Sequence, residues 1–579
     1  MIATVWDRLW RMHDETKSLF VFRPKAMVAR LTKEHLLFSK GRQEKEIDLA
    51  DEMEDAPSEH NIKCTPEGCD EDEPRGYSRR QLIGLWLGPA LFTLMLLVPT
   101  PTGMEPAAQR MAAIALLMAT WWMCESIPIP ATSLLPIVLF PWLGLMSTGR
   151  AAAPYANHLI FLFMGGFIIA LAMQRWNLHR RIAMNIVKVV GFSPPRLIFG
   201  FMVATAALSA FVSNTATTVM MMPIGLAIIA HVIDEGTKEG LDKTIDFSQG
   251  NFNFGLNLML GIAYAASIGG VATLIGTPPN TVLAGYLNKT YGYEITFAKW
   301  MSFGVPLVLI LLPLCWLWLI KVANPMKLKK VPGGRELIDE ELRKMGRMSA
   351  GERWTGQVFF FTAMAWIFRK QLSFLFPDPA LITDATIAMA GALVLFLIPI
   401  SLKKNIFVMD WHWASKMPWG VLLLFGGGLA LAQGFSDTKL AHWIGQQVGL
   451  LENAPVLVLV IAVAALIIFL TELTSNTATA AMVMPILSAI AIGLGQNPML
   501  LLIPAAIAAS CAFMLPVATP PNAIVFGTGY VTIPQMVRSG FGLNFISIIL
   551  AVAFTYLLAM PLFDIAIDTI PAWAMQVTP

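Results

Sequence analysis

Apolar stretches of 16 to 26 residues alternate with short polar connections along most of the chain. A helix needs about 20 consecutive apolar residues to cross the hydrocarbon core of a bilayer. The alternation therefore predicts a series of membrane-spanning helices. They are expected at residues 81–100, 108–123, 130–146, 155–174, 298–323, 353–374, 380–400, 417–434 and 541–562.

Four further apolar segments are each interrupted near their centre by a polar or proline-rich patch. They are residues 197–232, 254–288, 454–493 and 498–530. Unwound backbone at membrane depth is tolerated only where protein buries it or where it lines a polar cavity. Each interruption therefore indicates a re-entrant hairpin or a broken crossing helix.

Three basic clusters decide how these segments cross, because short cytoplasmic loops carry an excess of Lys and Arg. All three clusters lie in the cytoplasm only if 197–232 and 454–493 are hairpins and if 254–288 and 498–530 each cross once. The chain then has 11 transmembrane helices and two re-entrant hairpins, with a cytoplasmic N-terminus and an extracytoplasmic C-terminus. The clusters are Arg175, Arg180, Arg181 and Lys188; Lys327, Lys329, Lys330, Arg343 and Lys344; and Lys403 and Lys404.

Three motifs recur in the same order in the two halves of the chain. Each half has five crossings and one hairpin, and because five is odd the second half runs upside down. Inverted repeats with broken helices near the midplane are typical of secondary transporters. The pairs are FLFMGGFIIALAMQ (161–174) with LLLFGGGLALAQ (422–433), SNTATTVMMMPI (213–224) with SNTATAAMVMPI (475–486), and GTPPN (276–280) with ATPPN (518–522).

Composition agrees with an all-α polytopic membrane protein. Of the 579 residues, 56% are hydrophobic and 14% are charged, and the mean hydropathy is +0.62, whereas soluble domains carry about 25% charged residues. Of the 79 charged residues, 31 fall within residues 1–80. A net charge of +3 gives no reason to expect nucleic-acid binding.

Residues 177–190 have apolar positions at helical spacing opposite basic ones, which predicts an amphipathic helix on the cytoplasmic surface.

The expected organisation follows from these boundaries. It comprises a polar cytoplasmic extension (1–76), a first transmembrane helix (77–104), a first inverted repeat (105–325), a basic cytoplasmic loop (326–352), a second inverted repeat (353–565) and an extracytoplasmic tail (566–579).

The centres of the two hairpins carry the same three residues, Ser-Asn-Thr, at 213–215 and 475–477. These residue types cap helix N-termini. A half-helix that begins there directs backbone N–H groups and the positive end of its dipole at whatever lies above the tip. The hydroxyl and amide groups can donate to a carboxylate, and their oxygens can also bind a small cation.

Two proline pairs, Pro278-Pro279 and Pro520-Pro521, remove backbone donors and break the crossing helices. Carbonyl groups released around Gly276 and Ala518 can face a cation. A single Ser-Asn-Thr in a membrane helix is more often a contact between helices. Two copies, each accompanied by a matching Pro-Pro-Asn break, favour a binding site.

The four interrupted segments contain no Lys or Arg. An anion bound among them has no fixed cation to offset its charge, and burying a bare carboxylate is costly. The counter-charge must therefore arrive with the substrate, and sodium held by side-chain and backbone oxygens meets that need. The sequence thus predicts coupled transport of an anion and Na+.

Glu472 is the only acidic residue in these segments. It can be a partner for a proton or a cation, or a carboxylate held by backbone groups beside the tip. The second interpretation is favoured because its counterpart in the first half is Ala210.

These motifs resemble those of the divalent anion:sodium symporter family over about residues 80–570. The paired SNT signatures and the paired TPPN-like breaks carry the resemblance. It implies a homodimer held together by a scaffold domain, and an elevator-type transport domain that carries both hairpins and both broken helices. It also implies a sodium symporter in the cell inner (plasma) membrane that imports dicarboxylates such as succinate, malate and fumarate, and not an enzyme.

The resemblance further implies two sodium sites and a substrate site. The first sodium site would use Ser209, Ser213, Asn214 and the carbonyl of Gly276. The second would use Thr471, Ser475, Asn476 and the carbonyl of Ala518. The substrate would meet Ser213, Asn214, Thr215, Thr277, Ser475, Asn476, Thr477, Thr519 and Pro520.

Other functions stay open at this point. A citrate or sulfate symporter, or a sodium-independent dicarboxylate exchanger, could use the same fold. An intramembrane hydrolase would need a Ser–His, Asp–Asp or HExxH constellation within the spans, and the apolar spans supply none. A passive channel does not require two occluding hairpins.

Overall fold

The computed structural model describes residues 77–238, 246–248, 250–328, 330, 334–447 and 454–575. The predicted extension 1–76 and Lys329 lie outside the described residues. Within them the regular secondary structure is helical apart from β1 (Pro399–Ser401) and β2 (Ile406–Phe407), which form one antiparallel pair. The prediction of an all-α polytopic membrane protein is confirmed.

The helices follow the predicted order of spans and interruptions. The first half contains α3 (Arg79–Leu97), α4 (Pro106–Cys124), α5 (Ile129–Thr132), α6 (Leu135–Trp142), α7 (Thr148–Ala152), η1 (Ala153–Ala156), α8 (His158–Arg175), α9 (Leu178–Val190), α10 (Pro194–Ser209), α11 (Asn214–Lys238), α12 (Asn253–Gly270), α13 (Pro278–Tyr291), α14 (Phe297–Leu317) and η2 (Trp318–Ala323). The connection and the second half contain α15 (Gly334–Lys344), α16 (Ala350–Ile367), α17 (Arg369–Ser373), η3 (Pro379–Leu381), α18 (Asp384–Leu397), α19 (Trp411–Ala414), α20 (Trp419–Asp437), α21 (Leu440–Gln446), α22 (Val456–Thr471), α23 (Asn476–Gly493), α24 (Met499–Ser510), α25 (Pro520–Phe526), α26 (Ile533–Phe554), η5 (Thr555–Ala559), α27 (Met560–Phe563) and α28 (Ala572–Met575).

Seven helical segments in the described part of the chain are long and apolar enough to cross a membrane. Other apolar helices are shorter, and among them are the first arms of the two predicted hairpins. Helices α10 and α22 each have 16 residues, which is fewer than the roughly 20 that a full crossing needs. Their length suits arms that end at mid-depth. The seven segments are Arg79–Leu97, Thr148–Arg175, Asn214–Glu235, Phe297–Ala323, Trp419–Asp437, Asn476–Gly493 and Ile533–Phe563.

The predicted span 130–146 is not one continuous helix. Helices α5 and α6 are separated by residues 133–134. Pro136 lies in the first turn of α6, where a proline fits because no intrahelical hydrogen bond is lost. The proline that suits the start of a helix thus ends the preceding one, which the hydropathy of this stretch did not indicate.

The two halves share local structure beyond the sequence motifs. Asn177 and Lys439, which precede α9 and α21, both adopt a left-handed conformation with φ of 57°. Thr296 and Thr532 cap α14 and α26 with their side chains, and each of these helices continues into a π-helical turn. Equivalent caps and turns at equivalent places support the predicted internal repeat.

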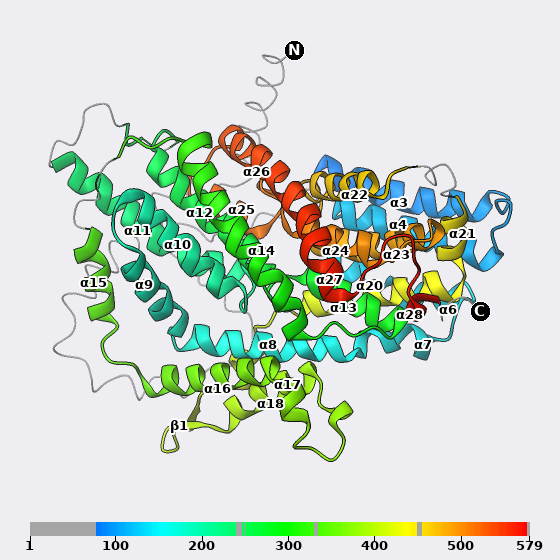
Figure 1. Ribbon diagram of the computed structural model, residues 1–579, viewed down its shortest axis with the longest axis horizontal. Helices are drawn as coiled ribbons and strands as arrows, with labels where there is room; N and C mark the ends of the chain where they lie inside the picture. Colours follow the sequence, from blue (N-terminus) through cyan, green and yellow to red (C-terminus); the bar gives the residue numbers. More distant parts are fainter. Residues whose placement is uncertain are drawn as a thin grey trace, which may run out of the picture.

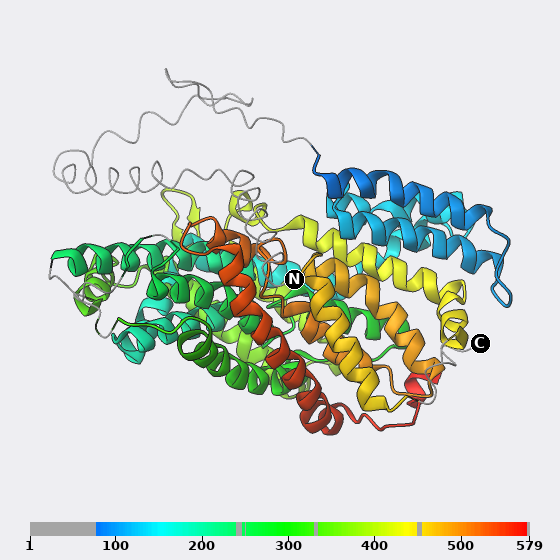
Figure 2. The same cartoon turned by 90° about the horizontal axis from the view of Figure 1, so that it is seen from above.

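The halves interlock through the elements that carry the interruptions. Helix α11 packs against α25, and α13 packs against α23, so each half places a broken helix on the hairpin of the other. Helix α8 runs lengthwise through the molecule and is covered by α16 and α18 (Figure 1). Seen from above, α3 and α4 lie together along one edge near α20 (Figure 2). Because of these contacts between the halves, the two predicted hairpin tips belong to the same packed unit.

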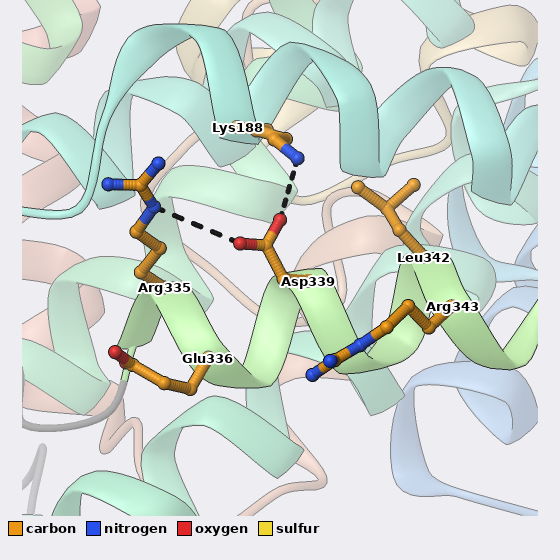
Figure 3. Close-up of a pocket in the computed structure, with 6 residues that line it drawn as sticks. All are labelled: Lys188, Arg335, Glu336, Asp339, Leu342 and Arg343. Carbon is orange, nitrogen blue, oxygen red and sulfur yellow. Dashed lines mark ion pairs between the residues drawn. The ribbon is translucent and has the colours of Figure 1, made fainter.

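The predicted amphipathic helix exists as α9, and its basic residues Arg180, Arg181 and Lys188 form ion pairs with Glu341, Glu352 and Asp339. The predicted loop 326–352 contains helix α15, which packs on α9. Lys188 on α9 lies 2.7 Å from Asp339, which also pairs with Arg335 at 3.8 Å (Figure 3). A hollow of about 620 Å³ lies between the two helices. None of its lining residues belongs to the predicted site.

Candidate functional site

The first tip lies where α10 ends at Ser209 and α11 begins at Asn214. Ser213 caps α11, since its Oγ accepts from the Ala216 N–H at 3.4 Å. Ser209 Oγ lies 2.7 Å from Asn214 Oδ1 and 2.7 Å from the carbonyl oxygen of Ala266 on α12. A single hydroxyl proton can serve only one of these two oxygens. With the Asn214 oxygen facing Ser209, oxygen atoms outnumber protons at this tip.

The carbonyl of Gly276 joins the same group of oxygens. The amide atom of Asn214 that faces Ser209 also lies 3.0 Å from the Ala266 oxygen and 3.2 Å from the Gly276 oxygen. If this atom is nitrogen, it donates to both carbonyls; if it is oxygen, it meets only other acceptors. A position where an amide oxygen meets only acceptors suits a cation. One hydroxyl, one amide and two carbonyls form a set of hard oxygen ligands that fits Na+.

The second tip repeats this arrangement. Helix α22 ends at Thr471 and α23 begins at Asn476. Thr471 Oγ1 lies 2.7 Å from Asn476 Oδ1 and 3.2 Å from the carbonyl oxygen of Ala509 on α24. Ser475 occupies the N-cap position of α23 without a capping bond from its side chain. A hydroxyl, an amide and a helix-end carbonyl therefore meet at both tips.

The predicted substrate residues differ in exposure. Thr215 and Pro520 are exposed, whereas Thr477 is buried, with 9% of its surface exposed. Thr277 and Thr519 are buried at 1% and 4%. In the described conformation the exposed members are thus the ones that a substrate can reach directly.

The predicted carbonyl ligand of the second site, Ala518, lies in the unwound segment between α24 and α25 and is 3% exposed. Its N–H donates to the Leu515 carbonyl at 3.2 Å. Ala518 thus occupies the same place in its break as Gly276 does in the first half.

The sequence did not indicate the carbonyls of Ala266 and Ala509. Ala509 is among the last four residues of α24, whose carbonyls lack intrahelical partners, and Ala266 directly precedes the last four residues of α12. A backbone carbonyl has no signature in the side chain of its residue, so only the repeated position of these two residues before the breaks could have suggested their contacts with the tips.

The asparagine of each Pro-Pro-Asn motif holds its break together, a role that the sequence interpretation left unassigned. Asn280 Nδ2 donates to the carbonyls of Gly270 (3.2 Å), Val271 (3.3 Å) and Thr273 (2.8 Å). Asn522 Nδ2 donates to the carbonyls of Ala512 and Leu515, at 3.2 and 3.1 Å. The repetition of this asparagine in both halves was the available signal.

Glu472 is held by backbone groups, which agrees with the interpretation favoured from the sequence. Its carboxylate accepts from the N–H groups of Phe513 (2.7 Å), Met514 (3.0 Å) and Leu515 (3.1 Å). Asn544 Nδ2 on α26 donates to the same carboxylate at 2.8 Å. Three successive N–H groups that converge on an anion form a backbone nest.

Comparison with known proteins identifies the family. The family model for the sodium:sulfate symporter transmembrane region matches residues 79–565. The chain belongs to the divalent anion:sodium symporter family. A relative from Staphylococcus saprophyticus, named sodium-dependent dicarboxylate transporter SdcS, is 46% identical over 494 residues, which cover 85% of this chain and 94% of that protein. Its counterpart from Staphylococcus aureus is 46% identical over 481 residues, covering 83% and 91%.

Two solved transporters share the fold of this symporter. The YdaH transporter of Alcanivorax borkumensis superposes with a TM-score of 0.53 at 13% sequence identity, covering 84% of this chain and 99% of that chain. MtrF of Neisseria gonorrhoeae superposes with a TM-score of 0.51 at 12% identity, covering 83% and 96%. At these identities the likeness concerns the fold alone.

Proposed function

We propose that this symporter imports C4-dicarboxylates, such as succinate, malate and fumarate, together with sodium ions. The observation that carries the proposal is the matching cluster of hydroxyl, amide and carbonyl oxygens at each tip. The four segments around the tips contain no lysine or arginine. Two sodium ions would offset the two negative charges that the substrate brings. Relatives named sodium-dependent dicarboxylate transporters support the same function.

The tips offer the donors that such an anion needs. Each is the N-terminus of a helix, α11 or α23, whose first N–H groups lack intrahelical partners. The side chains of Thr215 and Thr477 follow the Ser-Asn pairs at these termini. One carboxylate at each tip explains why the Ser-Asn-Thr motif occurs twice. A ligand with two separated carboxylates uses both termini, whereas a compact sulfate does so less well.

The mechanism that we propose is elevator-type alternating access. The hairpins and broken helices would move as one transport domain, because α11 with α25 and α13 with α23 pack across the repeat. The protein would lie in the plasma membrane as a homodimer, with its N-terminus in the cytoplasm and its C-terminus outside. In this topology the basic residues at 403 and 404 face the cytoplasm, as the positive-inside rule requires.

Uptake of radiolabelled succinate into proteoliposomes under an inward sodium gradient tests the substrate class. We expect excess malate or fumarate to abolish uptake, and citrate or sulfate to compete weakly. Strong inhibition by sulfate together with weak inhibition by malate would contradict the dicarboxylate proposal. Uptake that occurs only into vesicles preloaded with dicarboxylate would identify an exchanger instead.

A further inference from the structure

The internal repeat does not predict which side chains stabilise the unwound segment beside each tip, and the two halves differ in this respect. In the first half, the Thr273 hydroxyl donates to the carbonyl of Ala210 and accepts from the Gly276 N–H at 3.1 Å. In the second half, a carboxylate at the position equivalent to Ala210 binds the chain instead. Glu472 is 3% exposed, and its carboxylate takes part in five contacts with N–H donors.

These contacts shape the segment that follows α24. The N–H groups that Glu472 binds belong to residues 513–515, which lie between the Ala509 carbonyl and Ala518. The Thr471 hydroxyl, on the residue before Glu472, reaches the Ala509 carbonyl. Thr471 and Glu472, which are adjacent in the chain, therefore bind the same segment at two points. Asn522 and Tyr264 bind carbonyls of this segment, and Glu472 binds its N–H groups, so the carboxylate is the part of this network that fixes the direction of the three N–H groups after α24.

Resting on the proposed function, we infer that Glu472 is the positioning residue of the second sodium site. It does not bind the ion; its carboxylate holds the nest at residues 513–515 so that the carbonyls on either side of the nest face the ion. Asn544 orients the carboxylate by donating to Oε1. The first half has Ala210 at the equivalent position and holds its break through Thr273, so loss of Glu472 should affect one sodium site and leave the other unchanged.

Glu472→Gln tests this inference because it preserves size while turning one acceptor into a donor. The new amide nitrogen would face N–H groups of the nest, which leaves buried donors unpaired. The readout is the rise in unfolding temperature with sodium concentration in purified protein, since an ion that binds only the folded state stabilises it. We expect Glu472→Gln to raise the half-saturating sodium concentration of the second site about tenfold or more.

Two background variants, each with one sodium site disabled, distinguish the effects of Glu472→Gln on the two sites. With the first site disabled by Asn214→Ala, Glu472→Gln should show its full effect. With the second site disabled by Asn476→Ala, the same substitution should add almost nothing, because mutations at one site are not additive. Ser510→Ala is the matched control: this buried hydroxyl bonds only to the Ala506 carbonyl of its own helix, and its loss should change neither site.

If Glu472→Gln does not fold, Asn544→Ala gives the answer. This variant keeps every bond between the carboxylate and the backbone. It should raise the half-saturating sodium concentration of the second site by a smaller factor, roughly threefold. Equal effects on both sites, or no effect in the Asn214→Ala background, would overturn the role of Glu472. Absence of any sodium-dependent stabilisation in the wild-type protein would instead overturn the proposed function.

Discussion

Gly270 lies against the proposed first sodium site, and a single methyl group there should damage it. Gly270 is the last residue of α12. A Cβ atom added to it would lie 2.6 Å from Asn214 Oδ1 and 3.1 Å from the carbonyl oxygen of Gly276. Both atoms belong to the proposed ligand set, and the first distance is shorter than a real Cβ contact allows. Gly270→Ala therefore has to push the Asn214 amide out of its place.

The size of the effect follows from the rigidity of the surroundings. Residues 254–270 are all buried, so the backbone of α12 has little room to retreat. Inserting a methyl into such packing costs about 1–3 kcal/mol. If most of this cost falls on the geometry with sodium bound, sodium affinity at the first site drops roughly tenfold to a hundredfold, at about 1.4 kcal/mol per factor of ten.

The assay is sodium-dependent thermal stabilisation of the purified variant, together with the sodium activation curve of succinate uptake. Gly527→Ala is the control, because its added Cβ would meet nothing nearer than 3.4 Å and its φ of −59° suits any residue. We expect Gly527→Ala to match the wild type in both assays. Unchanged sodium activation in Gly270→Ala would refute the placement of the first site.

Three further results are expected. Thr477→Ala should weaken succinate affinity roughly tenfold to a hundredfold, because it removes a hydrogen bond to a charged acceptor worth about 1.5–3 kcal/mol, while sodium binding without substrate stays normal. Asn476→Ala should instead weaken sodium binding even without substrate. If Thr477→Ala loses sodium binding and Asn476→Ala keeps it, these roles are wrong. In a cysteine-free background, Cys at position 403 should react with an impermeant reagent only from the cytoplasm, and Cys at position 439 only from outside; labelling of both from one side would refute the topology. Arg181→Met should lower the free energy of unfolding by about 3–5 kcal/mol, because it removes the ion-pair partner 2.7 Å from the buried Glu352 carboxylate. Sodium and succinate affinities should stay normal. An unchanged unfolding temperature would contradict this role.

The features of this fold that the sequence predicted are those set by local chemistry. Proline pairs and Ser-Asn-Thr runs act on their own backbone, so the ends of α10, α12, α22 and α24 fall beside the predicted interruptions. Apolar length and loop charge likewise act locally. The hydroxyl–amide pairs of both proposed sodium sites were expected from the resemblance, and in each half they lie 2.7 Å apart.

What the sequence missed depends on tertiary contacts. The Ala266 and Ala509 carbonyls approach the tips only because α12 and α24 pack against the hairpins. A basic amphipathic stretch predicted helix α9, but its ion pairs with Asp339 (Figure 3) and Glu341 of α15 were not indicated by the sequence. The target of the Glu472 carboxylate lies 41 to 43 residues further along the chain. None of these pairings has a periodic or local signature.

Sodium dependence of succinate uptake tests the central claim most directly. Wild-type protein in proteoliposomes takes up labelled succinate with external sodium, and then with sodium replaced by choline or by potassium. Two oxygen clusters without a fixed cation predict saturable activation by sodium and no uptake above protein-free liposomes in either replacement medium. Equal uptake in choline would contradict the claim that sodium ions at the two tips offset the charge of the substrate.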